Sequence, residues 1–141
     1  MDSSLNEKYN SSKLTDELTN MFYEIIRHDE VLNHVFLFIA KTLITKEKTG
    51  DVSTGVIIND ITENVVLTRQ VRVKKGRTHA YEKAQANIHR KTAEKYVDIL
   101  LAMSLIYYKD LKPYKFLHLT VRGKQVFKNF ILENQSEKEN N

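Results

Sequence analysis

Turn-forming residues are scarce in this chain of 141 residues, which contains four Gly and one Pro. Because these two residues interrupt regular elements and supply most tight turns, their scarcity predicts long elements and a mainly helical fold. The length predicts one domain rather than two. Apolar residues make up 41% and charged residues 28% of the chain, which is the balance of an ordinary globular domain.

The composition also excludes several classes of protein. The chain has no Cys, which excludes disulfides, thiolate zinc sites and a cysteine nucleophile. Its first eight residues lack the basic start and the apolar run of a signal peptide. The longest apolar stretch, Val35–Ala40, is far shorter than the ~20 residues that a membrane span needs. We therefore expect a cytoplasmic protein that is neither secreted nor anchored in a bilayer.

Two helices are predicted in the first third of the chain by the spacing of apolar residues. One amphipathic stripe consists of Leu14, Leu18, Met21, Phe22, Ile25 and Ile26. A second helix begins at Asp29 or Glu30, whose charges suit a first turn. Its apolar residues are Val31, Leu32, Val35, Phe36, Phe38, Ile39 and Leu43. They surround most of the helix, so it is expected at the centre of a core or between a core and a second subunit.

Further elements follow along the chain. Ser53 or Thr54 is expected to cap a short helix that carries Val56, Ile57, Ile58 and Ile61. A longer helix is predicted from Tyr81 to Met103, with Ala93, Val97, Leu100 and Leu101 against the core. Two strands joined by a turn at 110–114 come next, and Thr120 is expected to cap a last helix that buries Val126, Phe127, Phe130 and Ile131. Residues 1–11 are expected to be a flexible N-terminus, 12–132 the domain and 133–141 a disordered tail.

Positive charge is concentrated in one part of the chain. Residues 1–68 carry six basic and eleven acidic side chains, whereas residues 69–95 carry nine basic and two acidic ones. Residues 96–141 carry seven and five, so the formal net charges of the three segments are −5, +7 and +2. A block at +7 is expected of a segment that contacts a polyanion, and the alternative is a solvated basic loop without a partner.

The start of this block has a pattern of its own. Val71 and Val73 alternate with Arg72 and Lys74, and the following Gly could turn the chain, so the pattern is compatible equally with a basic hairpin and with an irregular arm.

The second half of the chain resembles a known family. Residues 90–106 (RKTAEKYVDILLAMSLI) and 116–126 (FLHLTVRGKQV) resemble the recognition helix, the wing and the following helix of winged helix-turn-helix regulators of the MarR-like and PadR-like type. The positions that match the family pattern in order are Thr92, Ala93, Tyr96, Leu100, Ser104, Leu105, Ile106, Leu119, Thr120 and Gly123. The resemblance covers roughly residues 88–131 and is only topological before them. It implies a mainly helical winged helix-turn-helix fold with a small β-wing.

The resemblance implies how the chain would contact duplex DNA. With the apolar side of the helix against the core, its cations face outward near the N-terminal half, which enters the major groove in helix-turn-helix docking. Lysines of the wing would reach the DNA backbone or the minor groove, or would only keep an exposed hairpin soluble. The residues expected to contact DNA are Arg69, Arg72, Lys74, Lys75, Arg77, His89, Arg90, Lys91, Thr92, Lys95, Lys109, Lys112, Tyr114 and Lys115.

One departure from the family concerns the turn before the recognition helix. That turn has three or four residues in a helix-turn-helix, whereas some twenty residues separate Val65 from Asn87. Either a basic insertion at about 66–86 lies inside the motif, or the helix begins near Tyr81 and is unusually long. Both alternatives place Arg69 to Arg77 beside the DNA-binding edge, as an arm that neutralises phosphates.

Apolar faces remain on the first and last helices after a winged-helix core is assembled. In MarR-like proteins such helices pair across a two-fold axis, so the resemblance implies a homodimer that binds a palindrome. The alternative is that the terminal helices close the core of a monomer.

Neither catalysis nor metal binding is predicted. His28 and His34 are six residues apart and do not share a helical face, and the sequence has no phosphate-binding Gly-rich loop, no Gly-x-Ser-x-Gly and no paired acidic motif. The sequence therefore favours a nucleoid-associated, sequence-specific double-stranded DNA-binding protein without a cofactor, acting in transcription regulation. The alternatives are a plasmid or mobile-element factor for replication or partition, and a winged-helix module that binds protein.

Overall fold

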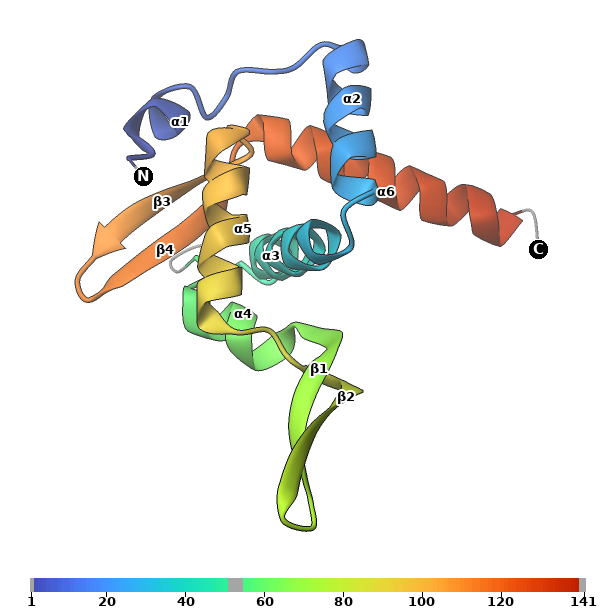
Figure 1. Ribbon diagram of the computed structural model, residues 1–141. Helices are drawn as coiled ribbons and strands as arrows, with labels where there is room; N and C mark the ends of the chain where they lie inside the picture. Colours follow the sequence, from blue (N-terminus) through green and yellow to red (C-terminus); the bar gives the residue numbers. More distant parts are fainter. Residues whose placement is uncertain (1, 51–54, 140–141) are drawn as a thin grey trace.

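A computed structural model of the chain describes residues 2–50 and 55–139 (Figure 1). The described part is a mixed α/β fold of six helices and two separate antiparallel hairpins. The helices are α1 (Ser4–Lys8), α2 (Asp16–Arg27), α3 (Glu30–Lys48), α4 (Ile58–Asn64), α5 (Arg90–Ala102) and α6 (Val121–Glu139). The strands are β1 (Val66–Lys75), β2 (Thr78–Asn87), β3 (Ile106–Leu111) and β4 (Tyr114–Leu119).

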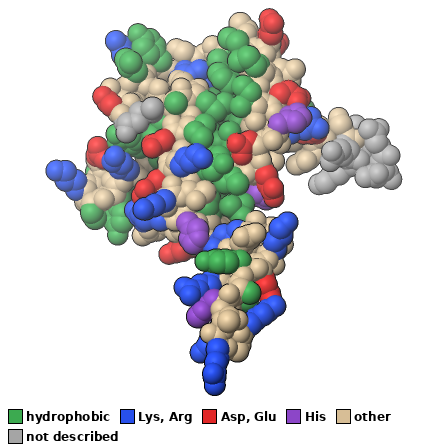
Figure 2. All heavy atoms as spheres, viewed as in Figure 1, with side chains coloured by type: hydrophobic (Ala, Val, Ile, Leu, Met, Phe, Trp, Pro, Cys, Tyr) green, Lys and Arg blue, Asp and Glu red, His purple; other side chains and the backbone are tan. Residues whose placement is uncertain are grey.

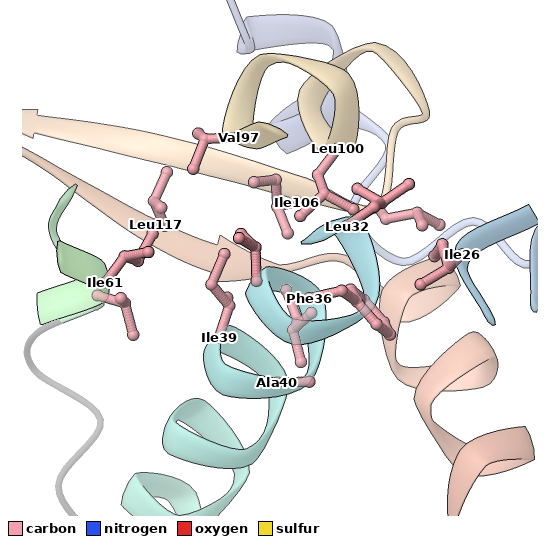
Figure 3. Packing of buried hydrophobic residues seen from close by; sticks show 14 of the residues in the cluster. Ile26, Leu32, Phe36, Ile39, Ala40, Ile61, Val97, Leu100, Ile106 and Leu117 are labelled. Carbon is pink, nitrogen blue, oxygen red and sulfur yellow. The ribbon is translucent and has the colours of Figure 1, made fainter. Parts of the chain in front are cut away.

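Helix α3 lies at the centre of the core, as the apolar residues around most of its circumference predict. Val35, Phe36, Ile39 and Ala40 are fully buried, and side chains from α2, α4, α5, β3 and β4 converge on them (Figure 3). Burial of each large side chain stabilises the fold by about 1.5–3 kcal/mol. The helix begins where the sequence predicts, because the Asp29 carboxylate accepts a hydrogen bond from the Leu32 backbone N–H at 3.1 Å.

The β3–β4 hairpin is connected to the helical core by one additional bridge. Val56 forms an antiparallel bridge with Leu117 of β4, with backbone N···O distances of 3.0 and 2.7 Å. Val56 therefore belongs to an extended segment and not to the short helix in which we expected it, since α4 begins at Ile58. The expected capping residues Ser53 and Thr54 lie outside the described residues.

A hydrogen-bonded corner brings the end of α5 next to the start of α6, and it explains the Leu-Thr-x-x-Gly pattern physically. The Thr120 hydroxyl donates to the carbonyl oxygens of Ser104 and Leu105 and accepts from the Gly123 N–H, which confirms Thr120 as a helix cap. A Cβ on Gly123 would lie 2.3 Å from the Leu105 carbonyl oxygen. Glycine is thus required here because the backbones of two elements approach closely.

The chain ends differ from expectation. Instead of a flexible N-terminus, Ser4–Lys8 form α1, which packs against β3; the Asn6 side-chain amide donates to the carbonyl oxygens of Leu101 (2.8 Å) and Ile106 (2.9 Å). Instead of a disordered tail from residue 133, α6 continues to Glu139. Ile131, expected on the buried side of this helix, is 41% exposed.

The predicted helix from Tyr81 to Met103 is wrong in its first part. Residues 78–87 form strand β2, and the helix begins only at Arg90. The insertion is therefore a β-hairpin between α4 and α5, and neither the unusually long helix nor the irregular arm occurs. In the rest of α5 the four residues expected in the core are buried.

Candidate nucleic-acid interface

The inserted hairpin projects from the body of the protein (Figure 1). Its two strands pair in register from Val66↔Asn87 to Lys75↔Thr78, leaving a two-residue loop. Gly76 has a φ of +62° at the first loop position, where a type II′ turn requires a positive φ. The alternation of residues 71–74 and Gly76 are thus part of a hairpin, which is one of the two alternatives that the sequence left open.

The base of the hairpin is anchored in the core. Val65, Leu67 and Ile88 are buried, and the Ile88 N–H donates to the Val65 carbonyl oxygen at 2.9 Å. A two-stranded ribbon alone is only marginally stable in water, so this anchor fixes the register of the ladder. The hairpin leaves and re-enters the body at adjacent points, directly before the first turn of α5.

The hairpin carries most of the concentrated positive charge. Residues 66–87 contain six basic side chains and one acidic one, a formal net charge of +5, and blue side chains cover the projection in Figure 2. Two of the cations are engaged within the hairpin. Lys75 forms an ion pair with Glu82 at 2.6 Å, and the Arg69 Nε donates to the Asn87 carbonyl oxygen at 3.1 Å. Within the described chain Arg72, Lys74, Arg77 and Lys83 make no such contact.

Helix α5 presents its expected DNA-contacting residues in two environments. Lys91 and Lys95 are exposed, Thr92 is half-buried, and His89 occupies the N-cap position without a capping hydrogen bond. Arg90, by contrast, contacts the Glu94 carboxylate at 3.1 Å and the Asn59 side-chain oxygen at 2.6 Å. Its guanidinium therefore connects α5 to α4 and is less free to contact a base than the sequence suggests.

A groove of about 470 Å³ lies between α4, α5 and the β3–β4 hairpin. Its lining includes Arg90 and Lys115, but also the carboxylates of Glu94 and Asp98. A phosphate group that entered this groove would meet two negative charges as well as two positive ones. The groove is consequently a poorer anion site than the inserted hairpin.

The β3–β4 hairpin carries the remaining expected contacts. Lys109, Lys112 and Lys115 are exposed, and the Lys115 ammonium lies 4.8 Å from the centre of the Tyr108 ring. Tyr114 packs its ring edge-to-face against Phe116 at 6.0 Å and is half exposed.

His118 lies further back on the same hairpin. Its ring stacks on Tyr107 at 5.4 Å, and burial, with help from the charge of Lys109, lowers its pKa. The neutral imidazole is therefore favoured, and this histidine adds no positive charge near pH 7.

The predicted contact residues thus fall into two groups. Those between Arg69 and Lys95 belong to the inserted hairpin and the adjoining first turns of α5, whereas the others belong to the β3–β4 hairpin. In Figure 1 the inserted hairpin extends below the N-terminal end of α5, and the β3–β4 hairpin extends to the left. The exposed polar residues of β2 that were not among the predicted contacts include His79, Lys83 and Gln85. The signal for them was the alternation of residues 79–87 with Ala80, Ala84 and Ala86, which reads equally well as helix because Ala is the best helix former.

Among residues 2–50 and 55–139, no three His, Asp or Glu side chains are grouped as a metal ion would require. In the same part of the chain no helix combines the length and the apolarity that crossing a bilayer demands. The sequence matches no protein-family model, no curated protein and no solved structure.

Proposed function

We propose that residues 30–119 form a winged helix and that the chain binds double-stranded DNA in a sequence-specific manner. The order of elements supports the winged helix: α3, the bridge residue Val56, α4, α5 and the β3–β4 hairpin. In this arrangement α5 takes the place of the recognition helix and β3–β4 that of the wing. The basic hairpin β1–β2 replaces the short turn between the second and third helices.

The observation that carries DNA binding is the projecting hairpin with its formal net charge of +5. A basic segment that is merely solvated needs no rigid support. These cations, by contrast, lie on a β-ladder of ten residue pairs whose end next to the body is buried. It adjoins Lys91 and Lys95 of α5, so cations from both elements can contact neighbouring phosphates of one duplex. We propose a role in transcription regulation, with binding to iterated sites for plasmid replication or partition as the alternative.

Duplex binding is tested by fluorescence anisotropy with random-sequence DNA and by selection from a random duplex library. We expect Kd values of about 10⁻⁶ M or below at 50 mM salt, and an affinity that falls steeply as salt increases. A selected palindrome would support a dimeric regulator, and selected tandem repeats would support the replication or partition role. If the chain binds no duplex at low salt, the DNA-binding proposal is wrong and a protein-binding module is favoured.

We further propose that the chain forms a homodimer through α2 and α6. These helices pack together within one chain, with the Tyr23 and Phe130 rings edge-to-face at 4.6 Å. The Tyr23 hydroxyl donates to the Glu133 carboxylate, and burial together with this contact raises the pKa of Tyr23 to about 12. Their outer sides still expose large apolar side chains. These are Leu18, Met21 and Ile25 on α2, and Ile131 and Leu132 on α6.

Substituting the exposed stripe of α2 is expected to convert a dimer into a monomer. Met21→Lys with Ile25→Lys places two charges on a surface that a two-fold interface would bury twice, at a large desolvation cost. The matched control, Asn20→Lys with His28→Lys, adds the same charge at exposed polar positions. Light scattering after size exclusion measures the mass; a wild-type monomer, or a double variant that stays dimeric, would exclude this interface.

A further inference from the structure

The two faces of the inserted hairpin differ in chemistry. Successive residues of a strand point to opposite faces, and directly paired residues share a face. In the observed register one side is here called the polar face. It consists of Val66, Thr68, Gln70, Arg72, Lys74, His79, Tyr81, Lys83, Gln85 and Asn87. The opposite side, here called the aliphatic face, carries Leu67, Val71, Val73, Ala80, Ala84 and Ala86, together with the cations Arg69 and Lys75 and the polar residues Thr78 and Glu82.

We infer that the polar face enters the major groove of duplex DNA as a two-stranded ribbon and reads base edges. The inference rests on the proposed DNA binding and identifies which surface supplies specificity in addition to α5. All ten residues of the polar face are exposed. Its three Lys and Arg side chains have no ion-pair partner in the described chain, whereas the two cations of the aliphatic face contact Glu82 and the Asn87 carbonyl oxygen.

The dimensions of the ribbon fit the major groove. The groove is about 12 Å wide and admits a two-stranded ribbon, whose strands lie about 4.8 Å apart. Ten residues per strand at about 3.4 Å each span about 34 Å, which is close to one turn of the duplex. The minor groove, about 6 Å wide, and the deep, narrow major groove of RNA are less suitable.

The residue types of the polar face match the chemistry of purine edges. Arg and Lys donate to guanine O6 and N7, and a Gln amide pairs with adenine N6 and N7. An arm that only neutralised phosphates would need no amides. Gln70 and Lys83 are directly paired on the ladder. Arg72, which is paired with Tyr81, is the next residue of this face on β1, and Gln85 is the next on β2, so amide and cation side chains lie side by side on one surface.

The test compares two variants that remove equal charge from opposite faces of the same ribbon. Arg72→Thr with Lys83→Thr changes the polar face, and Arg69→Thr with Lys75→Thr changes the aliphatic face. Each is titrated by anisotropy against a duplex selected by the wild-type chain and against random duplex. We expect the polar-face variant to lose roughly tenfold or more in the ratio of the two affinities, and the aliphatic-face variant to keep that ratio. Circular dichroism and thermal unfolding verify that both variants fold.

The main readout of a second measurement uses the wild-type chain alone. Replacing purines of the selected duplex by 7-deazapurines removes N7 from the major groove and leaves the minor groove unchanged. We expect a loss of affinity for the wild type at some positions, and a smaller loss at those positions for Gln70→Thr with Gln85→Thr, which alters no charge. Equal behaviour of the two charge variants, no effect of deazapurines, or preference for RNA would overturn the ribbon inference. Failure of the wild type to bind any duplex would instead refute DNA binding itself.

Discussion

Neutralising Arg69, Arg72, Lys74, Lys75 and Arg77 is expected to weaken duplex binding by roughly 10²- to 10³-fold at 100 mM salt. Each phosphate neutralised by a cation contributes a slope of about −0.9 to the dependence of log K on log salt, hence about 0.9 log unit at this concentration. Three of the five cations make no contact within the described chain, and at about 0.9 log unit each they account for the expected 10²- to 10³-fold loss of affinity. The other two add less because they already have partners.

The measurement is anisotropy across 50–300 mM salt, and the slope is the decisive quantity. We expect it to become shallower by about three units in the variant. A matched control replaces five exposed lysines outside both hairpins and α5: Lys13, Lys41, Lys48, Lys124 and Lys128. It removes the same formal charge and is expected to change the slope much less. An unchanged slope in the hairpin variant would contradict the role of the hairpin as a DNA-contacting arm.

Arg122→Met is expected to destabilise the fold by about 3 kcal/mol. Arg122 is only 7% exposed, and its guanidinium donates to the carbonyl oxygens of Tyr9 (2.6 Å), Ser12 (2.9 Å) and Ser104 (3.1 Å) and to the Ser104 hydroxyl (2.7 Å). Burial lowers the pKa of this group. Methionine keeps the apolar stem but leaves those acceptors without their charged donor, at a cost of about 1–3 kcal/mol for each acceptor that stays buried.

Thermal unfolding measures the effect, and a loss of about 3 kcal/mol corresponds to a Tm roughly 10 °C lower in a domain of this size. Lys124→Met is the control, since its ion pair with Glu47 at 2.9 Å is half exposed and such pairs contribute little. Because Arg122 also holds the segment after α1, we expect trypsin to cleave the variant faster at Lys8 and Lys13. A Tm within 2 °C of the wild type would show that the buried network contributes little to stability.

Hydrophobic periodicity predicted the elements whose buried residues follow a regular spacing within one short stretch of sequence. Helix α3 was placed at the core because apolar residues surround it, and the cap at Thr120 follows from its position before an apolar stripe. Strand β2 was missed because Ala80, Glu82, Lys83 and Ala84 have helical propensity, which pairing with β1 overrides. The N-terminal segment was missed because its order depends on Asn6, whose acceptors lie about a hundred residues away.

The candidate site was predicted in outline but not in detail. The charge block identified the hairpin cations from sequence alone, yet the division of those cations between two faces depends on the register of the ladder. The contact of Arg90 with Glu94 has the i, i+4 spacing that a sequence reveals. Its contact with Asn59 crosses between helices and requires the tertiary structure.

The two ends of the inserted hairpin lie next to each other, so the hairpin can change in length independently of the helices. Val65 and Ile88 are hydrogen-bonded neighbours at its base, so residues added or removed in matching pairs leave α4 and α5 where they are. Because successive residues point to opposite faces, steps of two such pairs keep the polar face on its side, and each step moves the tip by about 6.8 Å, the rise of about two base pairs. The number of paired residues in the hairpin can therefore change during evolution without any change in the helical body. Such a change would lengthen or shorten the segment of duplex that the proposed interface contacts.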